Sequence, residues 1–275
     1  MNVDSDKVRF ENSIISRLES LPFISFYAKT RGWYFLISWC HRITGILLVI
    51  FVWIHIYSLD SLAALGTHHA KIPAVRTFMI TVLGWILSIP VIFHAFNGGR
   101  LILYESFGKR NDESMIRWVF VLSILYVALL GLFILMGDQG VSPFLYWLMI
   151  FVTALIVAYG VAAKVWNTEH SFFWKFQRTS GAFLLVTVPA YILFIHLSPL
   201  SGKVTQMVFW GGQNFFIRVV HLAMLLGALY HGGYGIWSVV SDYRSSRILK
   251  AGLIILVILI TLIFAWFGIK LILGV

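Results

Sequence analysis

Seven long apolar runs dominate this chain and leave few folds open to it. In chain order they cover residues 36–59, 74–103, 117–137, 143–164, 179–198, 213–240 and 250–273. A helix needs roughly 20 apolar residues to cross the hydrocarbon core of a bilayer, and several of these runs reach that length. With 60% hydrophobic and 12% charged residues, the chain cannot cover itself with the polar surface of a soluble domain. We therefore predict an all-α fold: a polytopic membrane bundle of about seven transmembrane helices.

Two stretches need separate treatment. Within 117–164 only the short polar segment 137–140 separates two apolar runs, but together these runs are too long for one helix, so we predict two. Residues 1–35 are charged and have no long apolar core, so they do not resemble a cleavable signal peptide. We expect residues 1–35 to form a cytoplasmic segment, partly amphipathic, that lies along the membrane interface.

The distribution of basic residues predicts how the bundle is oriented. If the N-terminus is cytoplasmic, all but five of the 21 Lys and Arg residues lie on the inner side, as the positive-inside rule requires. We therefore expect an integral protein of a prokaryotic cytoplasmic (inner) membrane with its N-terminus inside. The excess of basic over acidic residues is then explained by topology and by contact with anionic lipid, and we expect no nucleic-acid partner.

Histidines inside the apolar runs indicate a function. The runs contain His55, His94, His196 and His231. An ionisable side chain in hydrocarbon costs about 2.5 kcal/mol or more on insertion scales, so it needs a partner or a role. A glycine follows His94 and His231 one helical turn later, at Gly98 and Gly235, on the same helix face. An imidazole beside a bare patch of helix, presented by each of two facing helices, suits a flat porphyrin.

We accordingly predict haem b with His94 and His231 as iron ligands. His94 lies six residues before Arg100, about 9 Å along a helix, and His231 lies eleven residues before Asp242, about 16 Å. Both would then lie in the cytoplasmic half of the membrane. Two histidine ligands leave iron no open site, which suits electron transfer rather than oxygen chemistry. The alternative is that both imidazoles only hydrogen-bond backbone carbonyls.

A faint internal repeat divides the chain. Arg42 precedes Gly45 by three residues, Arg178 precedes Gly181 by three residues, and each pair is followed by a span with a deep histidine. We predict two three-helix modules, residues 36–137 and 170–275, joined by one crossing helix at 143–164. The haem propionates would need cations near the interface, and the available side chains are His41, Arg42, Arg100 and Arg178.

Four segments resemble a known family. They are Ser38-x-x-His41-Arg42-x-Thr44-Gly45, His94-x-x-x-Gly98-x-Arg100, Arg178-Thr-Ser-Gly181, and His231-Gly-x-x-Gly235-x-Trp237 followed by Asp242-Tyr243. In this order they resemble the cytochrome b membrane anchor of succinate:quinone oxidoreductases and fumarate reductases. The chain looks like the large and small anchor subunits fused into one.

The resemblance implies a respiratory role. It implies a quinone, menaquinone or ubiquinone, at Ser38, Arg42, Asp242 and Tyr243, and partner iron–sulfur and flavoprotein subunits on the cytoplasmic face. Cys40 is the single cysteine and cannot hold an iron–sulfur cluster, so we expect no dehydrogenase active site in this chain. A higher oligomer of the whole complex stays open.

A second haem also stays open. His55 and His196 lie toward the outer ends of their spans, where two-haem members of the family hold a distal haem. His196 departs from the expected register, because Tyr191 stands at the offset from Gly181 that matches His55, and His221 is a substitute ligand. In the alternative, these histidines cap loops or face water.

Two other functions compete with the anchor. One is the cytochrome b subunit of a different respiratory enzyme, such as a formate dehydrogenase or hydrogenase. The other is a seven-helix proton-coupled transporter, in which buried His and Arg side chains handle protons or substrate.

Overall fold

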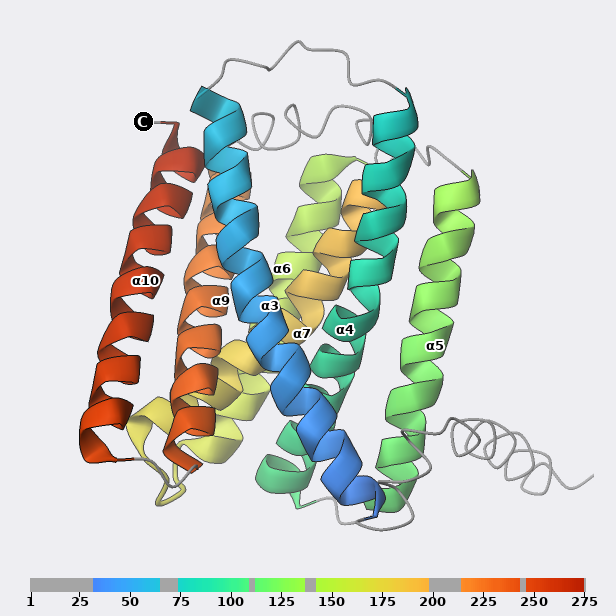
Figure 1. The fold of residues 1–275 in the computed structure, drawn as a ribbon. Helices are drawn as coiled ribbons and strands as arrows, with labels where there is room; N and C mark the ends of the chain where they lie inside the picture. Colours follow the sequence, from blue (N-terminus) through green and yellow to red (C-terminus); the bar gives the residue numbers. More distant parts are fainter. Residues whose placement is uncertain are drawn as a thin grey trace, which may run out of the picture.

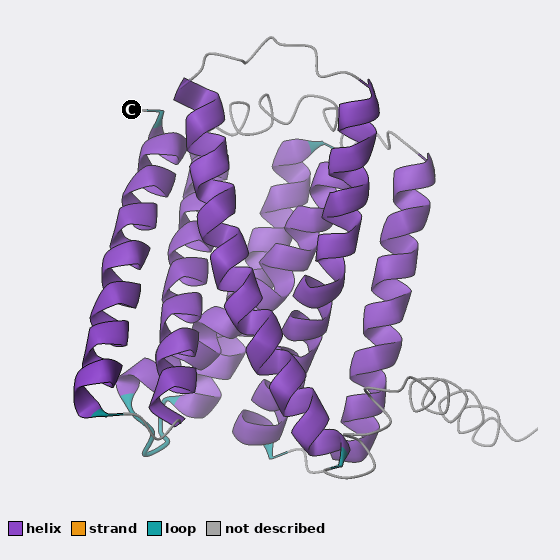
Figure 2. Cartoon of the chain, in the orientation of Figure 1, coloured by secondary structure: helices purple, strands orange, loops and turns teal. Residues whose placement is uncertain are grey.

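The computed structural model describes residues 32–64, 74–108, 112–136, 142–197, 214–242 and 246–274, and for 62–64, 74–80, 112, 113, 196 and 197 the backbone alone. This part of the chain folds into seven helices and contains no strand (Figure 2). The helices are α3 (Trp33–Ala64), α4 (Ala74–Phe107), α5 (Asp112–Met136), α6 (Pro143–Val165), α7 (Phe172–Leu197), α9 (Phe215–Asp242) and α10 (Arg247–Leu273). Most of the predicted interfacial segment 1–35 lies outside the described residues.

All seven helices are long and apolar enough to cross a membrane, which confirms the predicted fold class. Consecutive helices run in opposite directions, so that α3, α5, α7 and α10 begin at the end drawn lowest in Figure 1. We call this the lower end and the opposite one the upper end. The stretch 117–164 forms two separate helices, α5 and α6, as predicted.

Helix α7 begins earlier than its apolar run indicates. The run starts at residue 179, whereas the helix starts at Phe172. The added residues are aromatic and basic, and the Arg178 guanidinium lies over the Trp174 ring, 4.8 Å from its centroid. Aromatic and basic residues are typical of the membrane–water interface, so a count of apolar residues places the start of such a helix too late.

Four helices form a central ring. Helices α3, α4, α7 and α9 each pack against two of the others, in the order α3–α4–α7–α9–α3. Helix α5 packs mainly on α4, α6 on α7, and α10 on α9 and α3. The ring therefore contains the four helices that carry the sequence motifs, while the remaining three lie around it (Figure 1).

Side-chain hydrogen bonds attach the surrounding helices to the ring. The hydroxyl groups of Tyr126 on α5 and Tyr146 on α6 donate to the carbonyls of Pro189 (2.5 Å) and Ala190 (2.7 Å) on α7. A polar group inside hydrocarbon must find an internal partner, because no water is present. At the upper end, Lys270 of α10 forms a 2.8 Å ion pair with Asp60 of α3.

Candidate functional site

Three imidazoles lie close together inside the central ring of helices, toward the lower end. The ring centroids of His94 on α4 and His231 on α9 are 6.4 Å apart, and their planes are perpendicular at 90°. His41 on α3 stacks on His94 with centroids 3.9 Å apart and planes 4° from parallel. Helices from both halves of the chain therefore bring the two predicted haem ligands next to each other.

The backbone fixes the ring of His94. Its Nδ1 lies 3.1 Å from the carbonyl oxygen of His41 and 3.3 Å from the hydroxyl of Thr44. The Thr44 hydroxyl in turn donates to the carbonyl of Cys40 at 2.7 Å. A carbonyl accepts only from a protonated nitrogen, so Nδ1 carries the hydrogen and Nε2 the lone pair. A metal-binding histidine commonly has this arrangement, with its other ring nitrogen hydrogen-bonded to the protein.

Several polar atoms in this region are buried without a hydrogen-bond partner among the described residues. They include Nδ1 of His231, Nδ1 of His41, Nδ2 of Asn97 and Oε1 of Gln177. The other amide atom of Gln177, Nε2, donates to the backbone carbonyl of His231 at 3.2 Å. A buried polar group left unsatisfied costs about 1–3 kcal/mol. Such a group of atoms around the imidazoles fits a site that binds a polar or metal-containing ligand.

Each imidazole rests against a glycine of a neighbouring helix. A Cβ atom added to Gly45 of α3 would lie 2.9 Å from Cε1 of His94, and one added to Gly181 of α7 would lie 2.9 Å from Cε1 of His231. From the sequence, both glycines were only parts of a motif. Their close approach to the two histidine rings was not predicted. Gly98 and Gly235, which the sequence singled out, have more room, because their nearest neighbours would lie at 3.8 and 4.0 Å.

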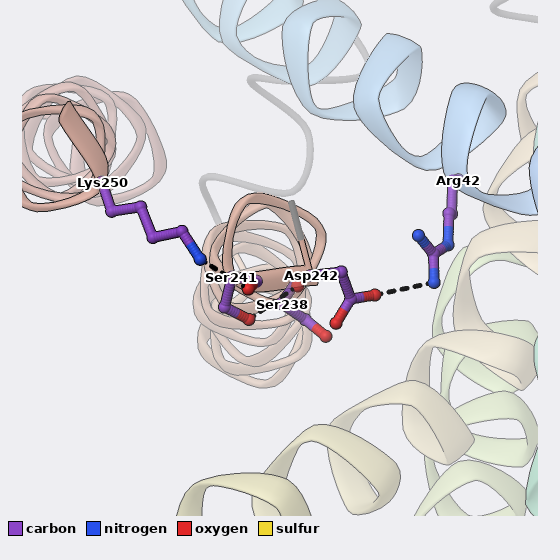
Figure 3. Close-up of polar contacts among 5 residues, drawn as sticks. All are labelled: Arg42, Ser238, Ser241, Asp242 and Lys250. Atoms are coloured by element: carbon purple, nitrogen blue, oxygen red, sulfur yellow. Dashed lines mark hydrogen bonds and ion pairs between the residues drawn. The ribbon is translucent and has the colours of Figure 1, made fainter. Parts of the chain in front are cut away.

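The three predicted arginines near the lower end each contact another polar side chain. Arg42 of α3 forms a 2.7 Å ion pair with Asp242 of α9 (Figure 3). Arg178 of α7 donates from Nε to Glu105 of α4 at 2.6 Å. Glu105 is a further residue that sequence reasoning missed, since an acid near a helix end looks like an ordinary interfacial charge.

The third cation, Arg100, is deeper than Arg42 and Arg178. It is only 7% exposed, and its Nε donates to Oδ1 of Asn97 at 2.8 Å. Asn97 lies one turn after His94 and is fully buried. Arg100 therefore provides a buried positive charge close to the imidazoles.

Two of the predicted quinone residues are in direct contact, Arg42 and Asp242. Ser38 lies one turn before Arg42 on the same face of α3 and is exposed. At the end of α9, Lys250 of α10 donates to the carbonyl of Ser241 at 2.8 Å, beside Asp242 (Figure 3). Tyr243 lies outside the described residues.

The histidines nearer the upper end have other neighbours. His55 stacks on Phe51, one turn earlier on α3, with centroids 5.5 Å apart. His221 of α9 contacts the rings of Trp147 and Tyr191 at 5.4 and 6.2 Å. His196 belongs to α7, but its side chain lies outside the described residues.

Comparison with known proteins shows what the first part of the chain is similar to. Residues 33–133, which cover α3, α4 and most of α5, match the family described as "Succinate dehydrogenase/Fumarate reductase transmembrane subunit". The succinate dehydrogenase 2 membrane subunit SdhC of Mycobacterium tuberculosis (strain ATCC 25618 / H37Rv) is 33% identical over 86 residues. That match covers 30% of this chain and 62% of the relative, somewhat less than two thirds of its length.

No solved structure matches the chain significantly. The matched residues contain the two segments, Ser38–Gly45 and His94–Arg100, on which the first half of the predicted resemblance depends. Over residues 33–133 the resemblance is thereby confirmed, and this part of the chain is similar to the transmembrane subunits of succinate dehydrogenases and fumarate reductases.

Proposed function

We propose that this protein is the haem b membrane anchor of a succinate:quinone oxidoreductase or fumarate reductase. It would pass electrons between an iron–sulfur subunit and a quinone in the membrane. The observation that supports this most directly is the approach of His94 and His231, from α4 and α9, in a chain whose first three described helices match that family.

The imidazole geometry fits one haem. His94 and His231 would hold the iron of one haem, since their ring centroids lie 6.4 Å apart. His41 covers the face of His94 but not the lone pair of Nε2, which lies in the ring plane. Held by His94 and His231, the haem would supply a one-electron relay. His41, Arg42, Arg100 and Arg178 would be the cations available to its propionates.

The quinone would bind beside α3 at the lower end. The Ser38 hydroxyl would donate to a quinone carbonyl, and the Arg42 guanidinium would stabilise the negative charge that develops there. Asp242 would hold Arg42 in place through their 2.7 Å ion pair. Tyr243 joins this set through the family resemblance alone. The quinone is menaquinone or ubiquinone.

The remaining proposals concern assembly. The lower end would face the cytoplasm, with the N-terminus inside and the iron–sulfur and flavoprotein subunits docked there. Helices α7, α9 and α10 would correspond to the small anchor subunit, joined through α6 to the large one formed by α3, α4 and α5. The membrane would be the cytoplasmic membrane of a prokaryote.

An absorption spectrum of the purified full-length protein tests the proposal. A reduced b-type α band should appear, and a pyridine haemochrome assay should give the amount of haem per polypeptide. A protein purified after haem-replete expression that shows no such band would contradict the proposal and favour a proton-handling transporter.

Substitution of the glycines behind the ligands should weaken haem binding. In Gly45→Ala and Gly181→Ala the new methyl group would lie 2.9 Å from a histidine ring, so the ring must move from its present position. We expect several-fold faster transfer of haem to apomyoglobin from both variants. Gly160→Ala on α6 is the matched control, because nothing lies within 4 Å of its added Cβ. Transfer rates equal to the control would contradict the close approach.

The number of haems per polypeptide tests whether His55 and His196 bind a second haem. We expect one haem per polypeptide, and we expect the same value in His55→Ala and His196→Ala. The reason is that His55 contacts Phe51, whereas the substitute ligand His221 contacts Trp147, so these described contacts do not bring the two histidines together. A wild-type value near two that falls to about one in His55→Ala would instead establish a distal haem.

A further inference from the structure

The internal repeat extends to an acidic residue at the same spacing from the histidine in each module. Glu105 lies eleven residues after His94, and Asp242 lies eleven residues after His231. Eleven residues are close to three full helical turns, about 16 Å. Each acid therefore lies on the same helix face as its histidine.

The two acids pair with the two arginines of the repeat in a crossed pattern. Arg42 of the first module pairs with Asp242 of the second at 2.7 Å, and Arg178 of the second pairs with Glu105 of the first at 2.6 Å. In the central ring the modules meet along α3–α9 and along α4–α7. Each ion pair joins the two helices of one of these contacts. At the lower end, an ion pair therefore connects the modules across both contacts.

We propose that the crossed ion pairs act together as a clamp between the modules, and that Glu105 is a positioning residue for the haem ligands. His94 and Glu105 belong to one rigid helix, and His231 and Asp242 to another. Fixing the acids at the lower ends of α4 and α9 therefore fixes how the two imidazoles face each other. This inference rests on the proposed haem function, because the haem reports that geometry.

The surroundings of Arg178 support a positioning role. Its guanidinium is held on one side by Glu105 and lies over the Trp174 ring at 4.8 Å. The ion pair is partly open to solvent, with side-chain exposures of 22% for Arg178 and 31% for Glu105. Pairs with such exposure contribute little to folding stability. Loss of the pair should therefore change the relative position of the modules more than the stability of the fold.

The test compares Glu105→Gln, Arg178→Glu and the charge-swapped double variant E105R/R178E in the full-length protein. The EPR spectrum of the ferric haem depends on the angle between its axial imidazoles, and the midpoint potential depends on their environment. We expect both to shift in the two single variants, with several-fold faster haem loss and little change in thermal unfolding temperature. The double variant, which restores an ion pair, should return toward the wild-type spectrum.

Asp60→Asn provides the matched control. It breaks the Asp60–Lys270 ion pair, which joins α3 to α10 at the upper end and bridges the same two modules far from the haem ligands. We expect its haem spectrum to equal that of the wild type. The inference is overturned if Glu105→Gln leaves the spectrum and potential unchanged, if Asp60→Asn shifts them equally, or if the double variant shows no recovery. Absence of haem from the wild-type protein would instead contradict the proposed function itself.

Discussion

Haem b is expected to disappear from the purified protein when either His94 or His231 is replaced by alanine. The two imidazoles are the only side chains proposed to bond the iron, and they come from opposite modules. Loss of an outer-shell partner typically lowers metal affinity about 10–100-fold, so loss of a ligand should lower haem affinity by more than about 100-fold. The measurement is haem per polypeptide from the pyridine haemochrome spectrum, with protein quantified independently.

The variant His41→Ala distinguishes an iron ligand from a residue that only packs beside one. The variant removes a ring that stacks on His94 but retains the backbone carbonyl that accepts from Nδ1 at 3.1 Å. We expect it to keep its haem, with a shifted midpoint potential. Full haem occupancy in both His94→Ala and His231→Ala would contradict the ligand assignment.

Replacement of Arg42 by alanine is expected to lower quinone reduction about 100-fold. A preorganised cation that stabilises developing negative charge is commonly worth about 10²–10³ in rate, and Arg42 is the proposed cation at the quinone carbonyl. The assay uses the assembled complex and compares electron transfer from succinate to quinone with transfer to a soluble dye. Dye reduction should remain at the wild-type rate, because in the proposed complex the dye would take electrons before they reach this chain.

Asp242→Asn tests the role of the carboxylate. It removes the 2.7 Å ion pair and leaves the guanidinium in place but less constrained, so we expect a smaller loss than in Arg42→Ala. Haem content measured on the same samples distinguishes loss of quinone chemistry from loss of haem. Equal quinone and dye rates in Arg42→Ala would contradict the proposed site.

The membrane fold was predictable because each helix must satisfy its own backbone in hydrocarbon, so length and apolar composition largely determine it. The start of α7 was not, because polar interfacial residues such as Lys175 and Arg178 interrupt the apolar run and still belong to the helix. His94 and His231 were conspicuous as ionisable residues in apolar runs. Their approach to 6.4 Å depends on the packing of α4 and α9 in one ring.

The supporting residues could not be identified from the sequence in the same way. Gly45 and Gly181 contact histidines 49 and 50 positions later in the chain, so helix packing and not local periodicity determines the contact. Glu105 is one acid among 11 acidic residues, and only its pairing with Arg178 distinguishes it. In both cases the missing information is which helix faces which.

The two imidazoles are held unequally, so the proposed iron site would have two different sides. His94 is hydrogen-bonded through Nδ1 to the backbone, whereas Nδ1 of His231 has no partner among the described residues. At the position of His41 in the repeat, the second module has Gln177, whose Nε2 donates to the backbone carbonyl of His231. A hydrogen bond at Nδ1 makes an imidazole a more basic donor, so His94 would be the stronger base and His231 the more easily displaced one.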